Sequence, residues 1–434
     1  IIGEGTINGN STSATIKSNT TGKTIIDGDC LINSENHQSI SNNNIVIINK
    51  GRIVSEAAEA VCIYSESSIE VNGGSLQGIN YAISNANGNV TVSAGVLEGG
   101  TFGIYNKGNT LVTGGIIKGD FAIHNTKGYY LKVTGGEIIS EKYMQNDGIL
   151  EIIGGKVYGK TFAIDMPVDT AVLTIGTNEE NPLVDITSPI IIGDNYGIRN
   201  VNNYTVNFYD GIIMGPEGKT IRGTVTDIPT GYRIVNGTQT IENTTYETAY
   251  LDNTYYITFN ENCENAQTTT KDIKYGTVIG ELPTLTRENY IFDGWYTAQT
   301  DGEKITKETV ITADTTFYAH WLEVVASTTI GDVTTNYASV QNAIDAAGTN
   351  AGATVTLLKD EIAETVTIAK NQDINIDING KTWANIGDQT ITNNGKLTLK
   401  GDGKVTSSSS YTITNNGTFD KYGNGTIEYT GRAY

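Results

Sequence analysis

Short runs of alternating apolar and polar residues, each closed by glycine or asparagine, fill most of the first 220 residues. Leu111-Val112-Thr113 and Leu131-Lys132-Val133 are two of them. Alternation with a period of two indicates β-strands, and Gly and Asn are typical turn residues. The segment lacks the 3.6-residue period of an amphipathic helix. The pattern therefore predicts many short strands joined by tight turns.

A pair of glycines, or its remnant, recurs along this region at nearly constant spacing. The second glycine of each pair is Gly74, Gly95, Gly115, Gly136 or Gly155, so the steps are 21, 20, 21 and 19 residues. A repeat of about 20 residues is typical of a solenoid, whose units are too small to fold alone and bury their apolar faces by stacking. We interpret the glycines as turn residues, since no GxGxxG, GxSxG or P-loop motif occurs.

A second marker shares this period: an apolar residue followed two positions later by asparagine. The apolar member first appears at Ile16 and then forms a predicted core column of Ile40, Ile63, Ile83, Ile104, Ile123, Met144 and Ile164. The asparagines form a predicted ladder of Asn42, Asn85, Asn106, Asn125 and Asn146, with Ser65 replacing asparagine in one unit.

These markers predict a parallel β-solenoid with about 20–23 residues per turn. Strands stacked at about 4.8 Å would superpose like residues, so that the isoleucines fill a column and the asparagine amides bond from turn to turn. We interpret the ladder as structural and not as a ligand site. Cys62 falls in a small inward position and is expected to be a buried, inert thiol. The solenoid is assigned to residues 1–228 with an insertion near 178–189, and residues 229–254 to terminal strands and a connector.

An aromatic-rich module follows at residues 255–322. The run from Leu282 to Tyr296, which ends in Asp293-Gly294-Trp295-Tyr296, and the run Phe317–Trp321 resemble the internalin-type B repeat, also called the Listeria–Bacteroides repeat. The resemblance implies a small β-grasp-like module of exported bacterial surface proteins. Members usually carry a glycine-containing turn where this chain has residues 262–265. The aromatic residues are expected to fill the core rather than to form a sugar platform; they are Tyr290, Phe292, Trp295, Tyr318 and Trp321.

Residues 323–336 are polar and predict a linker. Tyr337, Val340, Ile344 and Ala347 then share one face of a predicted helix over residues 337–347, which we expect to cap a second solenoid over residues 337–434. The asparagine marker returns at Asn393 and Asn415, 22 residues apart. The helix and the strands after it resemble the first turns of pectate-lyase-like β-helices. The predicted fold class is thus all-β: a solenoid, a β-grasp-like module and a helix-capped, truncated second solenoid.

Charge and composition narrow the function. The chain has 434 residues with 48 acidic and 28 basic side chains, a net charge of −20, and no basic run. This excludes nucleic acid and anionic membrane surfaces as favoured partners. No apolar stretch is long enough to cross a membrane. Three scattered cysteines and three isolated histidines predict neither a disulfide framework nor a zinc site. The two ends resemble cuts in a longer precursor, or a mature form.

Clustered carboxylates would indicate catalytic activity, because β-helices include polysaccharide lyases and hydrolases. Such enzymes need two or more carboxylates on adjacent turns. The acidic residues appear singly and are interpreted as solvated surface: Glu98, Asp120, Glu137, Asp147, Glu151 and Asp165. Asp373, Asp377 and Asp388 form the densest acidic group, and a half-exposed strand explains them better than a calcium site does. We predict no catalytic, cofactor-binding or metal-binding residues.

The leading hypothesis is a non-enzymatic, exported protein of a bacterial cell surface or cell wall, a rod-like stalk or adhesin that mediates attachment or forms a fibre. Its partner would be a surface receptor, a glycan or a cell-wall polymer. A polysaccharide-binding or polysaccharide-cleaving β-helix is the first alternative. End-to-end self-association into filaments is the second, because an uncapped row of strands is a template for pairing.

Overall fold

The computed structural model describes residues 3–9, 13–19, 22–56, 61–178, 187–386 and 389–429. The chain divides into two compact units, Ile1–Asn253 and Thr254–Tyr434. Strands dominate both units, and the described residues contain a single short α-helix. The predicted all-β solenoid class is confirmed.

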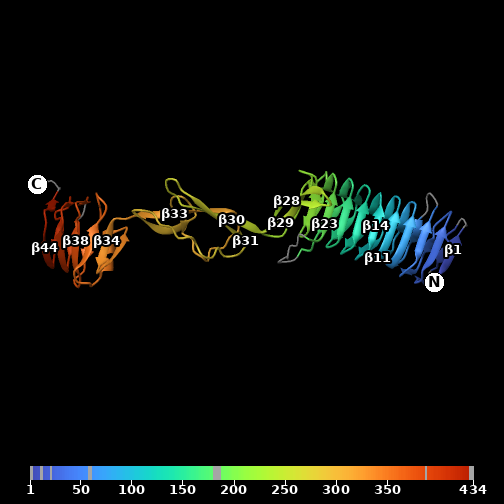
Figure 1. Cartoon of the computed structure of the whole chain (residues 1–434), viewed down its shortest axis with the longest axis horizontal. Coiled ribbons are helices and arrows are strands. Elements are labelled where there is room, and N and C mark those ends of the chain that lie inside the picture. The colour runs from blue at the N-terminus through green and yellow to red at the C-terminus, as the bar shows by residue number, and fades with distance from the viewer. Residues whose placement is uncertain are drawn as a thin grey trace. The chain divides into compact units, whose positions relative to one another are not determined.

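The first unit is a parallel solenoid whose turns each contribute three short strands (Figure 1). Successive turns pair in parallel along three rows, which we call ladders one, two and three. Ladder one is a 10-stranded sheet made of β2 (Ile16–Ser18), β5 (Ile40–Asn42), β8 (Val61–Ser65), β10 (Tyr81–Asn85), β12 (Phe102–Asn106), β15 (Phe121–Asn125), β18 (Met144–Asn146), β21 (Phe162–Asp165), β24 (Tyr196–Arg199) and β27 (Ile221–Arg222).

Ladders two and three join into one bent sheet, because β9 (Ile69–Gly78) and β11 (Asn89–Gly99) run through the bend between them. Ladder two contains β3 (Lys23–Ile26), β6 (Ile45–Ile48), the first halves of β9 and β11, β13 (Asn109–Val112), β16 (Tyr130–Val133), β19 (Ile149–Ile152), β22 (Val172–Ile175) and β25 (Thr205–Phe208). Ladder three contains β1 (Gly5–Gly9), β4 (Cys30–Ser34), β7 (Arg52–Ser55), the second halves of β9 and β11, β14 (Ile116–Gly119), β17 (Glu137–Ser140), β20 (Lys156–Gly159), β23 (Ile190–Gly193) and β26 (Ile212–Gly215).

The repeated glycines lie at this bend for two physical reasons. Gly115, between β13 and β14, has a φ of 80°, a region that favours glycine. A Cβ atom at Gly115 would also lie 2.9 Å from the carbonyl oxygen of Gly95 in the preceding turn. The turns can therefore stack at strand spacing only where this side chain is absent.

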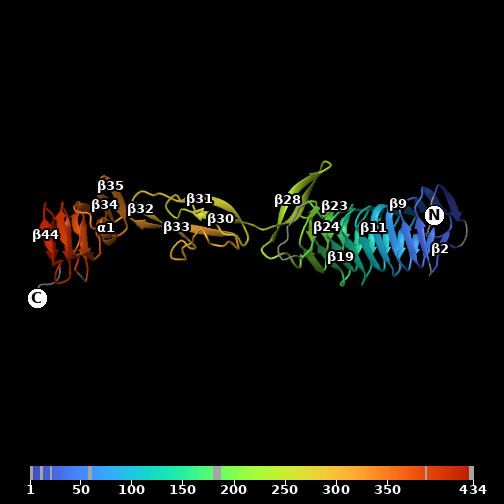
Figure 2. The same cartoon turned by 90° about the horizontal axis from the view of Figure 1, so that it is seen from below.

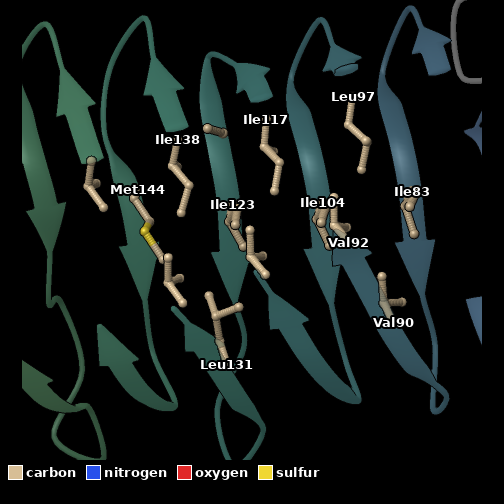
Figure 3. Close-up of a cluster of buried hydrophobic side chains, with 14 of the residues drawn as sticks. Ile83, Val90, Val92, Leu97, Ile104, Ile117, Ile123, Leu131, Ile138 and Met144 are labelled. Carbon is tan, nitrogen blue, oxygen red and sulfur yellow. The ribbon is translucent and has the colours of Figure 1, made fainter. Parts of the chain in front are cut away.

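Apolar side chains from all three ladders fill the interior. The structure places the predicted column in consecutive strands of ladder one, with Ile83 paired to Ile63 and to Ile104. All seven members, Ile40 to Ile164, are fully buried. Figure 3 shows Ile83, Ile104, Ile123 and Met144 side by side, facing valines and leucines such as Val92 and Leu97 from the other ladders. The core is thin, and it is continuous from turn to turn.

An antiparallel hairpin closes the C-terminal end of this stack (Figure 2). Strand β29 (Thr244–Asp252) pairs antiparallel with β26, and β28 (Arg233–Ile241) pairs with β29. Tyr246 packs with Ile192, Ile212 and Met214, which point outward from ladder three. The insertion expected near 178–189 falls between β22 and β23, and residues 179–186 lie outside the described residues.

The second unit begins with a mixed four-stranded sheet in the order β31 (Thr268–Lys274), β30 (Thr254–Asn260), β33 (Thr315–Glu323) and β32 (Tyr290–Tyr296). Trp295 is buried, and its Nε1 donates to the carbonyl oxygen of Pro283 at 2.7 Å. Phe292 and Trp321 pack against the same core. An isolated bridge joins Val278 to Val310. Asn262 adopts a positive φ of 50° in the segment that lacks the usual glycine.

The second solenoid follows, and its first strands replace the expected linker at 323–336. β34 (Ala326–Ile330) and β35 (Val333–Tyr337) form a hairpin, and β34 also pairs antiparallel with β36 (Ala353–Leu357). The stretch is polar but rich in threonine, whose β-branched side chain favours strands. Parallel pairing then builds three rows: β36, β38 (Asp373–Asp377), β41 (Lys396–Lys400) and β44 (Thr418–Lys421); β37 (Val366–Ile368), β40 (Ile391–Asn393) and β43 (Ile413–Asn415); β39 (Thr382–Asn385), β42 (Lys404–Ser407) and β45 (Thr426–Tyr429).

Helix α1 (Val340–Ala347) lies beside β34 and β35 (Figure 2) and covers the second core. It begins three residues later than predicted, because Tyr337 pairs in β35 and Ser339 is the N-cap. The half-buried Glu364 accepts hydrogen bonds from the Ser339 hydroxyl and from the backbone N–H groups of Val340 and Gln341, at 2.6, 2.8 and 3.0 Å. A carboxylate at this position stabilises the positive end of the helix dipole.

We predict that Glu364→Gln lowers the free energy of unfolding of the second solenoid by about 1–2 kcal/mol, since it removes the charge that the helix terminus binds. Asp332→Asn is the matched control, because Asp332 is exposed in the β34–β35 turn. Urea unfolding followed by circular dichroism measures both. Equal midpoints for the two variants would contradict this role of Glu364.

Candidate functional site

The asparagine ladder lies inside the first solenoid, at the end of each ladder-one strand. The Nδ2 atom of Asn85 donates to Oδ1 of Asn106, Asn106 donates to Asn125, and Asn125 donates to Asn146, each at 2.9 Å. Asn42 donates to the Ser65 hydroxyl at 2.9 Å. All of these side chains are buried. Their polar atoms bond to one another and to turn carbonyls, so this column offers no group to a ligand.

The hydrogen-bonded asparagine ladder is not continued in the two turns after Asn146. Met166 follows Asp165 at the position that asparagine holds in neighbouring turns, and it is buried. Asn200, one turn further on, is also buried, but its Nδ2 donates locally to the carbonyl oxygen of Tyr204. In the second solenoid Asn393 donates to Asn415 at 2.7 Å.

We predict that Asn106→Ala lowers the free energy of unfolding of the first solenoid by at least about 2 kcal/mol, because it leaves the buried amides of Asn85 and Asn125 each short of a partner. Asn109→Ala is the control: Asn109 bonds to Asn89 on the surface, and its loss should cost under about 0.5 kcal/mol. Urea unfolding of the two variants tests this. Equal losses would show that the ladder contributes nothing beyond surface contacts.

The three cysteine thiols differ in their exposure to solvent. Cys62 is fully buried, its Sγ lies 3.3 Å from the carbonyl oxygen of Ile53, and burial raises the pKa of its thiol to about 12. Cys30 is also buried, whereas Cys263 is partly exposed. A buried thiol with a raised pKa is a poor nucleophile.

We therefore expect a thiol reagent such as dithionitrobenzoate to label one cysteine per native chain, Cys263, and three after denaturation. Mass spectrometry of the labelled peptides locates the site. Rapid native labelling of Cys62 would contradict the packing at this position.

Outside the core, ladder one carries a row of aromatic rings that we call the aromatic column. It occupies six successive turns, and its members lie two residues, or in one case one residue, before the buried apolar residue of each turn. The rings are those of Tyr81, Phe102, Phe121, Tyr143, Phe162 and Tyr196, and each is half-buried. Neighbouring ring centroids are 4.8–6.2 Å apart. The sequence contains this spacing as aromatic-x-Ile, and our sequence interpretation missed it.

A second row, the polar column, runs along the same outer face: Tyr105, His124, Gln145, Asp165 and Arg199. The His124 ring and the Gln145 amide both contact Asp147, the imidazole Nε2 at 2.8 Å. The Arg199 guanidinium donates to both carboxylate oxygens of Asp165, at 2.8 and 3.0 Å.

Asp165 corrects one expectation, because it was interpreted as solvated surface. It is 3% exposed, and its partner Arg199 lies over the Phe162 ring. Burial raises the pKa of its carboxyl, and the hydrogen bond from Arg199 opposes that rise. The face thus holds a largely buried ion pair between Asp165 and Arg199.

A groove of about 600 Å³ lies on the outer side of ladder three and gathers acidic residues from several turns. Glu98 and Asp120, which the sequence suggested were isolated, both line it together with Glu141, Arg52 and Lys118. Lysines outside the groove pair with two of these carboxylates: Lys142 lies 2.9 Å from Asp120, and Lys160 pairs with Glu141. Two of the three carboxylates in the groove are therefore engaged in ion pairs.

Two carboxylates of the densest acidic group have partners within the protein. Asp373 pairs with Lys396 at 3.1 Å, and Asp377 accepts the backbone N–H of Asn379 at 2.9 Å. Asp388 lies outside the described residues. Within the described ranges, no group of three histidine, cysteine or carboxylate side chains is arranged to hold a metal ion.

Comparison with known families places the aromatic-rich module. Residues 255–320 match the Listeria-Bacteroides repeat domain. The match covers strands β30 to β32 and most of β33. This repeat is typical of bacterial surface proteins. The solenoids lie outside the match, so their resemblance to pectate-lyase-like β-helices stays a prediction, as does the internalin-type assignment of the repeat.

No curated protein and no solved structure matches the chain. In the described part of the chain, no helix has the length and apolar character that a membrane crossing requires.

Proposed function

We propose that the chain is a non-enzymatic part of an exported bacterial surface protein and serves as a rod-like stalk or adhesin. The observation that carries this proposal is the unbroken pairing of ladder one through ten strands. Repetition of one small unit builds length without a larger core, and each strand inside the row is paired on both edges. Local opening of such a strand breaks two sets of hydrogen bonds, which favours resistance to proteases outside the cell.

The repeat domain supports the location. A Listeria-Bacteroides repeat domain lies between the two solenoids, and that repeat is typical of bacterial surface proteins. The net charge of −20 supports solubility of a long fibre through mutual repulsion. A surface receptor, a glycan or a cell-wall polymer remains the proposed partner, and end-to-end association remains an alternative mode of fibre formation.

Polysaccharide cleavage is the second candidate, because the ladder-three groove gathers Glu98, Asp120 and Glu141. Hydrolysis of a glycosidic bond needs one carboxyl group that stays protonated beside one that is ionised. Lysines pair with two of the three carboxylates, so these two are engaged in ion pairs rather than set against each other as an acid and a base. We therefore rank cleavage below the structural role.

Immunogold electron microscopy of intact source cells, with antibody raised against this chain, tests the proposal. We expect label along fibres or on the wall, and antibody pre-absorbed with purified chain should give none. Label confined to the culture medium would overturn the surface assignment. Assays of polysaccharide turnover, with Glu98→Gln as the comparison variant, would then come next.

A further inference from the structure

We propose that the outer face of ladder one, from Tyr81 to Tyr196, binds a neutral glycan chain along the stacking direction. The proposal gives a ligand class to the adhesin inferred above and rests on that function for its biological setting. The binding itself belongs to the purified chain and does not depend on where the chain is displayed.

The first argument is that the fold does not need these rings. The rings lie two residues before the buried apolar residue of their turn. In the turn before Tyr81 this position is occupied by Val61, and in the turn before that by Gln38. The stack pairs in register through those turns without an aromatic residue at this position. The isoleucine column already fills the interior beneath the face. Six consecutive aromatic rings on the outside therefore call for a role besides packing.

The second argument is the geometry of the rings. Tyr81 and Phe102 are nearly parallel, at 13°, with centroids 5.4 Å apart, and Phe102 and Phe121 are 5.5 Å apart at 28°. Ring planes in contact are only about 3.5–4.0 Å apart, so rings with this centroid distance must be offset sideways. Each of these three rings then leaves part of its face uncovered by its neighbouring ring. Further along the column Tyr143 meets Phe121 edge-on at 73°, and the cations of Lys142 and Arg199 lie over the Phe121 and Phe162 rings. The column spans six turns, about 24 Å at the usual strand spacing.

The third argument is the polar column beside the rings. Pyranose sugars present an apolar face of C–H groups and a rim of hydroxyl groups. Aromatic faces suit the first, and groups that both donate and accept hydrogen bonds suit the second. Tyr105 and His124 contact the Phe102 ring and lie beside the column. Within the described residues, the Tyr105 hydroxyl has no hydrogen-bond partner.

Charge decides between glycan classes. Two carboxylates on or beside the face are ion-paired, Asp165 with Arg199 and Asp120 with Lys142, and Asp147 contacts the His124 imidazole. Three further cations lie over rings of the face: Lys107 over Tyr105, and Lys219 and Arg222 over Tyr196. An anionic polymer would have to break these pairs and approach a chain of net charge −20. A neutral polymer requires neither. The same reasoning disfavours single-stranded nucleic acid, which also stacks on aromatic rings but carries a phosphate at each residue.

The experiment uses the full chain. Affinity gel electrophoresis and titration calorimetry measure its binding to soluble neutral polysaccharides, namely a β-glucan, a xylan and a mannan. Polygalacturonate and single-stranded DNA serve as anionic probes. We expect binding to at least one neutral polymer and none to the anionic probes. No measurable binding to any of the neutral polymers, or binding to the anionic probes alone, would overturn the proposal.

Two variants locate the site. Phe102→Leu/Phe121→Leu keeps apolar bulk but removes two ring faces, and it should lower the association constant at least tenfold. Tyr105→Phe keeps the ring and removes the unpartnered hydroxyl, so it should weaken binding several-fold without change in the unfolding midpoint. Tyr411→Leu removes an exposed aromatic residue from the second solenoid and is the matched control.

Binding that survives the double variant and Tyr105→Phe unchanged would place the glycan elsewhere and overturn the assignment. If the double variant unfolds at lower urea concentration, its loss of binding could come from unfolding. The binding of Tyr105→Phe then decides whether the glycan lies on this face. The outcome is separable from the surface proposal: cells labelled by immunogold with no glycan binding would remove only this inference, and glycan binding by a chain found only in the medium would remove only the surface role.

Discussion

Parallel pairing in register between one turn and the next is the constraint on which the rest of this molecule depends. Once strands stack at about 4.8 Å with equivalent residues superposed, each position along the turn becomes a column of like environment. Each column therefore requires a residue type whose side chain can pack against, or bond to, an identical side chain in the turns above and below. Isoleucine does so by packing, asparagine by bonding amide to amide, and glycine by leaving room for a carbonyl oxygen.

The apolar column and the asparagine column differ in which substitutions they tolerate. In the interior, Met144 replaces isoleucine without loss of burial, because apolar volume is what the position requires. Met166 in the asparagine position interrupts the ladder, since a thioether does not continue a chain of amide hydrogen bonds. The outer columns are freer still, and Val61 and Tyr81 pair across adjacent strands. Residue choice on the outer face is therefore where function can act with little cost to the fold.

The same constraint explains how much could be predicted from the sequence. The isoleucine and asparagine columns were found by their period, because register turns sequence spacing directly into contact. The aromatic column has the same period, but it contains both tyrosine and phenylalanine, so identity between turns does not reveal it. The acidic groove is only partly visible this way: Asp120 and Glu141 directly follow the paired residues Gly119 and Ser140, whereas Glu98 lies two positions earlier in its turn. Residues 323–336 are polar and predict a linker, but their β-branched threonines pair in strands. The helix starts later than predicted because Tyr337 is held in a strand.

The β28–β29 hairpin has a bearing on how such a protein can evolve. Because β29 runs antiparallel to β26, no further parallel turn can be laid on that edge in register. Length can then change only upstream, by duplication or deletion of whole segments of about 20 residues, each of which brings its own isoleucine, asparagine and glycine. A gene that expands in such steps changes the reach of its product while the closing hairpin and all that follows it stay the same.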